Sequence, residues 1–189
     1  MASSQAINEL ILKKLLQHYG IILTDKDPVP LFGLKLLSVI VERNQGFVAI
    51  LKKLNLVQIL LEYFQAGHSK FNAYTVKIVK QIVAQKDIEL EQLEEANLVK
   101  KVNEIMQSVM SNHQEWCTDS LLDIMNDILH KAANLQQEKP DSPVPQSCYE
   151  KLLINFNNFI KLLGAQNQVI VEKASNNILA FIHFSSKFC

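Results

Sequence analysis

The sequence predicts an all-α protein, and three observations support this fold class. Apolar residues recur at three- and four-residue spacing along most of the chain, whereas the strict alternation of β-strands is nowhere sustained. Of the 189 residues, 48% are hydrophobic, which is enough for one packed core. Only 5 glycines and 5 prolines are present, too few for the many turns of an all-β fold.

The apolar spacing places the helices in order along the chain. A first helix is predicted around Ile7, Leu10, Ile11 and Leu15, and the turn from Asp25 to Pro30 ends it. Further helices are predicted at 30–42, 45–54, 56–66, 71–85, 87–96, 98–111 and 113–136.

The segment 136–147 is predicted to be a proline-rich loop. Pro140, Pro143 and Pro145 lack a backbone donor and disfavour helix in the residues before them. Ser147 and Glu150 have the spacing of a capping box, which predicts that helix resumes there. Two last helices are expected within 148–163 and 167–184, separated by Gly164.

An internal repeat is the most informative feature of the sequence. Shifted by 42 residues, Leu34-Lys35-Leu36-Leu37 aligns with Val76-Lys77-Ile78-Val79, and Asn55-Leu56-Val57 aligns with Asn97-Leu98-Val99, without a gap. A period of about 42 residues is typical of armadillo and HEAT arrays, whose short helices stack because no unit can bury its apolar face alone.

The repeat predicts one armadillo/HEAT-like α-solenoid of about three to four repeats over residues 1–189. Repeats are placed near 30–66, 72–111 and 113–136, the last drifting by one position, and the helices of 148–184 are predicted to cap the array. Phe181, Phe184 and Phe188 are too apolar for an exposed cap, so this tail is expected to fold back or to join another chain. Phe47 and Trp116 are expected in the core.

The string Pro28-Val29-Pro30-Leu31-Phe32-Gly33-Leu34-Lys35-Leu36-Leu37 resembles a segment of the C-terminal armadillo/HEAT region of the Fused and unc-51-like kinase family. The resemblance extends through both Asn-Leu-Val turns, over about residues 28–110, and is greatest to a pseudokinase member. It implies a scaffold of ciliary and microtubule-linked assemblies. Because the sequence has no glycine-rich nucleotide loop, His-Arg-Asp or Asp-Phe-Gly motif, nothing catalytic carries over.

The sequence offers little for catalysis or cofactor binding. His113 and Cys117 share a helix face and would be the candidate thiol–imidazole pair, but no oxyanion-forming glycine or further zinc ligand accompanies them. Asp119, Asp123 and Asp127 are spaced four apart, which is more typical of a solvated helix face than of a cation site. We therefore expect no enzyme activity, cofactor, metal or small-molecule substrate.

Charge and cysteine content indicate the class of partner. A net charge of +0 with Arg43 as the only arginine argues against nucleic acid, and no apolar run reaches the roughly 20 residues of a membrane span. Cys117, Cys148 and Cys189 form no disulfide framework, and the N-terminus has no signal pattern, so a cytoplasmic, ciliary or cytoskeletal protein is expected.

The charges are polarised along the chain. Residues 28–86 sum to +6 and residues 87–150 to −9, and stacked units keep sequence order in space. In an armadillo array the third helix of each unit lines the concave groove. The candidate partner-binding residues on those helices are Lys35, Lys77, Lys80, Gln81, Asp119 and Asp123.

These observations predict a non-catalytic protein-interaction scaffold. The basic half would bind an acidic partner, with tubulin tails on microtubules or a Fused-type kinase as the candidates that the resemblance suggests. Two alternatives stay open: a purely structural part of an axoneme or filament, and a Cys/His enzyme or metal protein. The charged segments also have a simpler reading as solvated helix faces.

Overall fold

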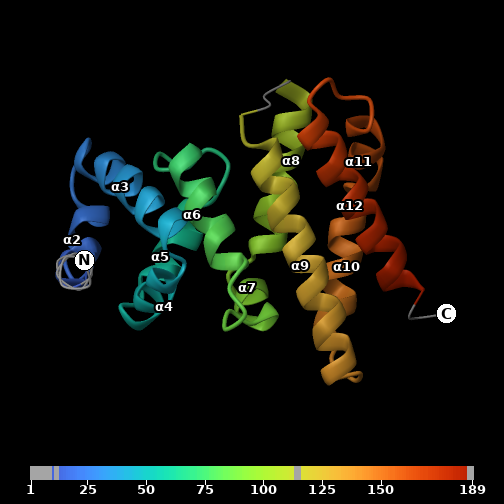
Figure 1. Cartoon of the computed structure of the whole chain (residues 1–189), viewed down its shortest axis with the longest axis horizontal. Coiled ribbons are helices and arrows are strands. Elements are labelled where there is room, and N and C mark those ends of the chain that lie inside the picture. Colours follow the sequence, from blue (N-terminus) through green and yellow to red (C-terminus); the bar gives the residue numbers. More distant parts are fainter. Residues whose placement is uncertain (1–9, 11–12, 113–115, 187–189) are drawn as a thin grey trace, which may run out of the picture.

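The computed structural model describes residues 10, 13–112 and 116–186, and those residues form helices and connecting turns without any strand (Figure 1). The helices are α2 (Tyr19–Thr24), α3 (Val29–Arg43), α4 (Gly46–Lys53), α5 (Leu56–Tyr63), α6 (Ala73–Val83), α7 (Leu90–Glu95), α8 (Leu98–Asn112), α9 (Thr118–Glu138), α10 (Val144–Leu153), α11 (Phe156–Leu162) and α12 (Gln168–Ser185). Ile7 and Ile11 of the predicted first helix lie outside the described residues.

Four helices, α3, α6, α9 and α12, form the frame of the molecule, and we call them the ladder helices. Each packs against the next in chain order, from α3 at one end of the array to α12 at the other (Figure 1). Helices α2, α5, α8 and α11 each precede a ladder helix in the chain and pack on it. This stacking of equivalent helices confirms the predicted all-α, HEAT-like solenoid.

The two Asn-Leu-Val turns have the same backbone geometry. Asn55 precedes α5 and Asn97 precedes α8, and each has φ = 55° in the left-handed region. Asparagine adopts this conformation more readily than most residues. The corresponding turn before α11 differs, because Asn155 has φ = −90° and is fully buried, where it donates to Asn103 Oδ1 at 2.6 Å.

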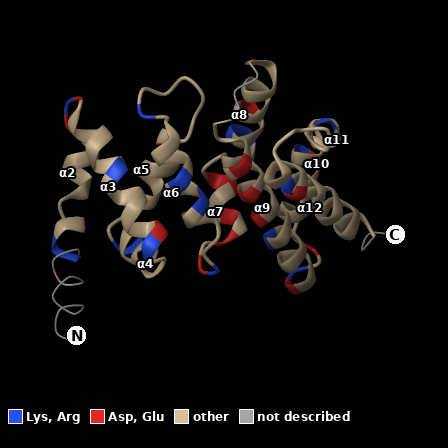
Figure 2. Ribbon diagram, turned by 45° about the horizontal axis from the view of Figure 1, so that its top comes forward, with Lys and Arg blue, Asp and Glu red and all other residues tan. Residues whose placement is uncertain are grey.

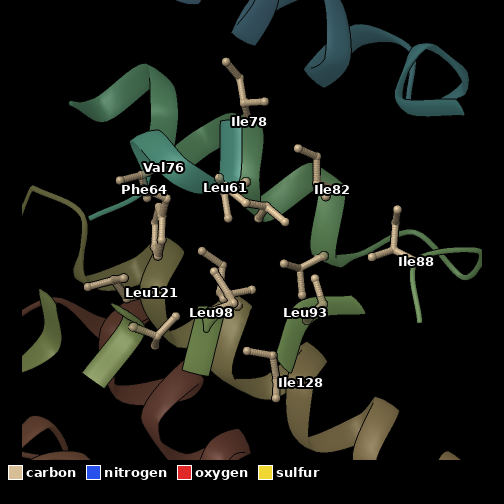
Figure 3. Close-up of a cluster of buried hydrophobic side chains, with 14 of the residues drawn as sticks. Leu61, Phe64, Val76, Ile78, Ile82, Ile88, Leu93, Leu98, Leu121 and Ile128 are labelled. Atoms are coloured by element: carbon tan, nitrogen blue, oxygen red, sulfur yellow. The ribbon is translucent and has the colours of Figure 1, made fainter. Parts of the chain in front are cut away.

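The apolar core runs through the stack without interruption. Figure 3 shows its central part, where Ile78 and Ile82 of α6 lie above Leu93, Leu98 and Leu121 from the next helices. Phe47 is buried in this core, as predicted. The prediction for Trp116 is wrong: it is 47% exposed and packs at the surface beside Phe71, with ring centroids 5.8 Å apart.

The predicted loop at 136–147 is too long. Helix α9 continues to Glu138, and α10 already begins at Val144. Pro145 occupies the first turn of α10. Backbone amides in the first turn have no acceptor within the helix, so a proline there removes no helical hydrogen bond. The predicted capping box is also wrong, since Ser147 lies inside α10 and Glu150 accepts a hydrogen bond from Gln146.

The predicted cap at 148–184 consists of three helices, because the chain turns at Asn155 between α10 and α11. Helix α12 stacks on α9 as a fourth ladder helix. Phe181 and Phe184 fold back as predicted: both are buried and lie against Tyr149, with ring centroids 5.2 and 4.7 Å away. Phe188 lies outside the described residues. Within the described part of the chain, no helix combines the length and apolarity needed to cross a membrane.

Candidate protein-interaction surface

The six predicted partner-binding residues all lie on ladder helices. Lys35 belongs to α3, Lys77, Lys80 and Gln81 to α6, and Asp119 and Asp123 to α9. Figure 2 shows basic residues on α3 and α6 and acidic residues around α7 and α9. Five of the six side chains bond to a neighbouring ladder helix or to the turn that follows one, so the repeat register brings them onto one connected surface.

Asp123 is the centre of this surface. Its Oδ2 accepts from Lys80 Nζ of α6 at 2.7 Å and from Lys173 Nζ of α12 at 2.8 Å. Lys173 also reaches Asp119 Oδ2 at 3.5 Å. Partial burial lowers the pKa of Lys80, but its hydrogen bond and attraction to Asp123 outweigh that effect and raise it. Two lysines thus share one carboxylate and tie three ladder helices together.

A second set of polar contacts joins α3 to α6. Lys77 Nζ lies 3.3 Å from Glu42 Oε1, and Gln45 Nε2 donates to Gln81 Oε1 at 3.1 Å. All four side chains remain partly or largely exposed. Surface ion pairs of this kind contribute about 0–1 kcal/mol each, so a charged partner can compete for their groups.

Lys35 is the exception among the six. It is exposed, and its ammonium forms no hydrogen bond or ion pair with any other residue that the structure describes. In the repeat it is equivalent to Lys77, which is satisfied by Glu42 of the preceding ladder helix. Lys35 therefore presents an unpaired positive charge to solvent.

Two open grooves adjoin the ladder helices and meet at His130. The first, of about 470 Å³, lies between α6, α7 and α9 and includes Asp127. The second, of about 350 Å³, lies between α9 and α12, where Asn126 and His183 are among its lining residues. Asn126 Oδ1 is buried there without a hydrogen-bond partner among the described residues.

Sequence reasoning did not place Glu42 or Lys173 in the site, and it considered Asp127 only as a candidate cation ligand. Glu42 and Lys173 complete the ion pairs of the predicted residues, and Asp127 lies in the groove without an ion pair or hydrogen bond to another described residue. The apolar spacing of residues 168–185 could have placed Lys173 on a ladder helix, but that segment was predicted to be a cap. The ion pair between Lys173 and Asp123 joins residues 50 positions apart, and no local sequence pattern predicts such a pair.

The structure offers no support for the Cys/His alternative. His113 lies outside the described residues, and Cys117 is buried. Burial, reinforced by the charge of Asp119, raises the pKa of the Cys117 thiol to about 12, so the thiolate nucleophile is not available near neutral pH. Within residues 10, 13–112 and 116–186, no three His, Cys, Asp or Glu side chains gather as metal ligands. Lys173 fills the space between Asp119 and Asp123 instead.

Comparison with known proteins agrees with this architecture. Residues 1–49 match the family model described as serine/threonine-protein kinase ULK4-like, HEAT repeats. The serine/threonine-protein kinase ULK4 of Mus musculus is 31% identical to the chain over 101 residues. That alignment covers 51% of this chain and 8% of the mouse protein, so the chain matches only a small part of this relative's length.

Proposed function

We propose that this chain, which contains a HEAT-repeat region of the ULK4-like kind, is a non-catalytic scaffold that binds other proteins on its ladder helices. The observation that carries the proposal is the connected polar surface over α3, α6, α9 and α12, with open grooves beside it. Solenoids present such extended surfaces to partners, and their charges set the register and rate of binding.

The partner of the α3–α6 part of this surface is an acidic segment. Lys35 has no partner in the described chain, and Lys77 pairs only with the exposed Glu42, whereas Lys80 pairs with the more buried Asp123. The resemblance to the unc-51-like family makes the acidic tails of tubulin the first candidate, which would place the protein on ciliary or cytoskeletal microtubules. A Fused-type kinase is the second.

Co-sedimentation with microtubules tests this function. Binding should fall as salt rises, because it depends on charge, and should fall again when the acidic tails of tubulin are removed. Lys35→Glu should weaken it severalfold without loss of stability, since Lys35 makes no internal ion pair. Lys77→Glu combined with Lys80→Glu should weaken it further.

Lys100→Glu is the matched control, because Lys100 is exposed on α8 and makes only a 3.9 Å pair with Glu104. Equal binding by the Lys35 and Lys100 variants would show that α3 and α6 are not the docking surface. Absence of binding to both forms of tubulin would exclude microtubules as the partner and direct the search to kinases of the Fused group. A purely structural role in an axoneme would show as a protein that folds only within its assembly.

A further inference from the structure

We infer that the outer face of α3 is a docking surface for a second copy of this chain, whose α12 stacks on it head to tail. That face consists of Phe32, Leu36 and Val39, which are 64%, 47% and 41% exposed. Three large apolar side chains in one exposed helical stripe are typical of an interaction surface. Lys35 lies on the same side of α3 as these residues, but the inference does not rest on the proposed function, because it concerns self-association through apolar side chains.

The repeat shows what this stripe is built to contact. By the 42-residue shift, Phe32, Leu36 and Val39 are equivalent to Tyr74, Ile78 and Gln81 of α6. Ile78 is fully buried and points toward α3 in Figure 3. Tyr74 packs against the core, and Gln81 accepts a hydrogen bond from Gln45 of the preceding unit.

The positions through which α6 packs on the preceding ladder helix are therefore exposed to solvent on α3. Helix α2 packs on α3 near Gly33, where the Tyr19 hydroxyl donates to the Gly33 carbonyl, and it leaves the stripe open. Among the described residues, no ladder helix precedes α3. The occupant that completes the stack is thus another ladder helix with an apolar outer side.

Helix α12 supplies such a side at the opposite end of the molecule. Lys173 reaches α9, and Ile182 follows it by nine residues, which is two and a half turns of an α-helix and places the two residues on opposite sides. Ile182 therefore faces away from α9 and is 54% exposed, with the partly buried Ile178 one turn before it. Glu172 on the same helix is exposed and makes no ion pair within the described residues, so it can meet Arg43 or Lys35.

The exposed stripe of α3 and the outer side of α12 can pack together in the way that consecutive ladder helices do. The contact would repeat the packing of α12 on α9, and a formal net charge of +0 opposes association of copies very little. Because the contact joins two different faces of the chain, it does not close on itself, and the assembly grows with concentration.

Sedimentation velocity over a range of concentrations tests the inference on the full chain. The average mass should rise with concentration and pass beyond that of a dimer. Leu36→Glu at one end and Ile182→Glu at the other should each weaken association about tenfold or more, because each buries a charge in the contact. Leu153→Glu, at a 43% exposed position of α10 away from both ends, is the matched control.

Mixing the two variants gives the sharpest result. Leu36→Glu keeps an intact α12 side and Ile182→Glu keeps an intact α3 stripe, so the mixture should form a dimer that contains one copy of each and stops there. Circular dichroism would establish that both variants are folded. A wild-type protein that stays monomeric at every concentration would overturn the inference. So would a dimer that Ile182→Glu leaves unchanged, since two α3 stripes would then face each other.

Discussion

Asn55 and Asn97 lie 42 residues apart and have the same backbone dihedral, φ = 55°. Each is exposed and leads into a medium-length helix that packs on the next ladder helix. The repeat in the sequence is thus also a repeat in backbone conformation, and in these two units a left-handed asparagine leads into the helix that precedes a ladder helix.

Substitution at these two turns should separate backbone from side-chain effects. Asn55→Ala and Asn97→Ala should each lower the free energy of unfolding by about 1 kcal/mol, because alanine is disfavoured at positive φ, where asparagine is tolerated. Asn55→Gly and Asn97→Gly should be neutral or slightly stabilising. Urea denaturation of the four variants measures this, and equal losses for Ala and Gly would show that the asparagine side chain matters instead.

Gly33 should not tolerate a side chain. A Cβ there would lie 2.5 Å from Ile22 Cγ2, so the Ile22 side chain, or α2 with it, would have to shift. We expect Gly33→Ala to lower the free energy of unfolding by about 1–3 kcal/mol, as overpacking commonly does. Gly164→Ala is the control, because its Cβ would meet only the Lys161 carbonyl at 3.5 Å, and that variant should retain full stability.

Asp127 should make stability depend on pH. Partial burial, and then the charge of Asp123, raise the pKa of Asp127 above the ordinary aspartate value of 3.8. The Asp127 carboxyl group therefore binds a proton more tightly in the folded state than in the unfolded state. Ionised Asp127 lowers the free energy of unfolding at neutral pH, and this loss disappears as the pH falls to 3.8. Asp127→Asn should therefore raise the free energy of unfolding at pH 7 by about 0.5 kcal/mol.

The gain from Asp127→Asn should shrink steadily between neutral pH and pH 4. Urea denaturation at several pH values measures it. Asp141→Asn, in the exposed loop after α9, is the matched control and should change stability equally little at every pH. A gain for Asp127→Asn that does not vary with pH would contradict the assignment.

Cys117 and Cys148 should be unreactive in the folded protein. Both thiols are buried, and burial raises the pKa of each to about 12, with a further contribution from a nearby carboxylate. Iodoacetamide at pH 8 should leave both unmodified until denaturant is added, as judged by mass spectrometry of their peptides. Rapid labelling of Cys117 in native buffer would instead revive the thiol–imidazole alternative.

The fold class follows from the sequence alone, because helical periodicity and the 42-residue repeat are patterns in the order of the residues. The sequence also located most helices and the residues of the polar surface, since equivalent positions in a stack face the same way. The loop prediction failed at Pro145, because the cost of proline in a helix depends on whether its backbone amide would otherwise form a hydrogen bond. The prediction of a buried Trp116 failed because helical periodicity does not show which other helices pack against a residue.

Tertiary structure alone decided which charges meet. Asp123 pairs with Lys80 and with Lys173, a residue 50 positions away on a helix that the sequence marked only as a cap. It also decided that Leu36 stays exposed while the equivalent Ile78 is buried, although their local sequences match. The physical reason is the same in both cases: burial and ion pairing depend on the neighbour across the stack, which the local sequence does not encode.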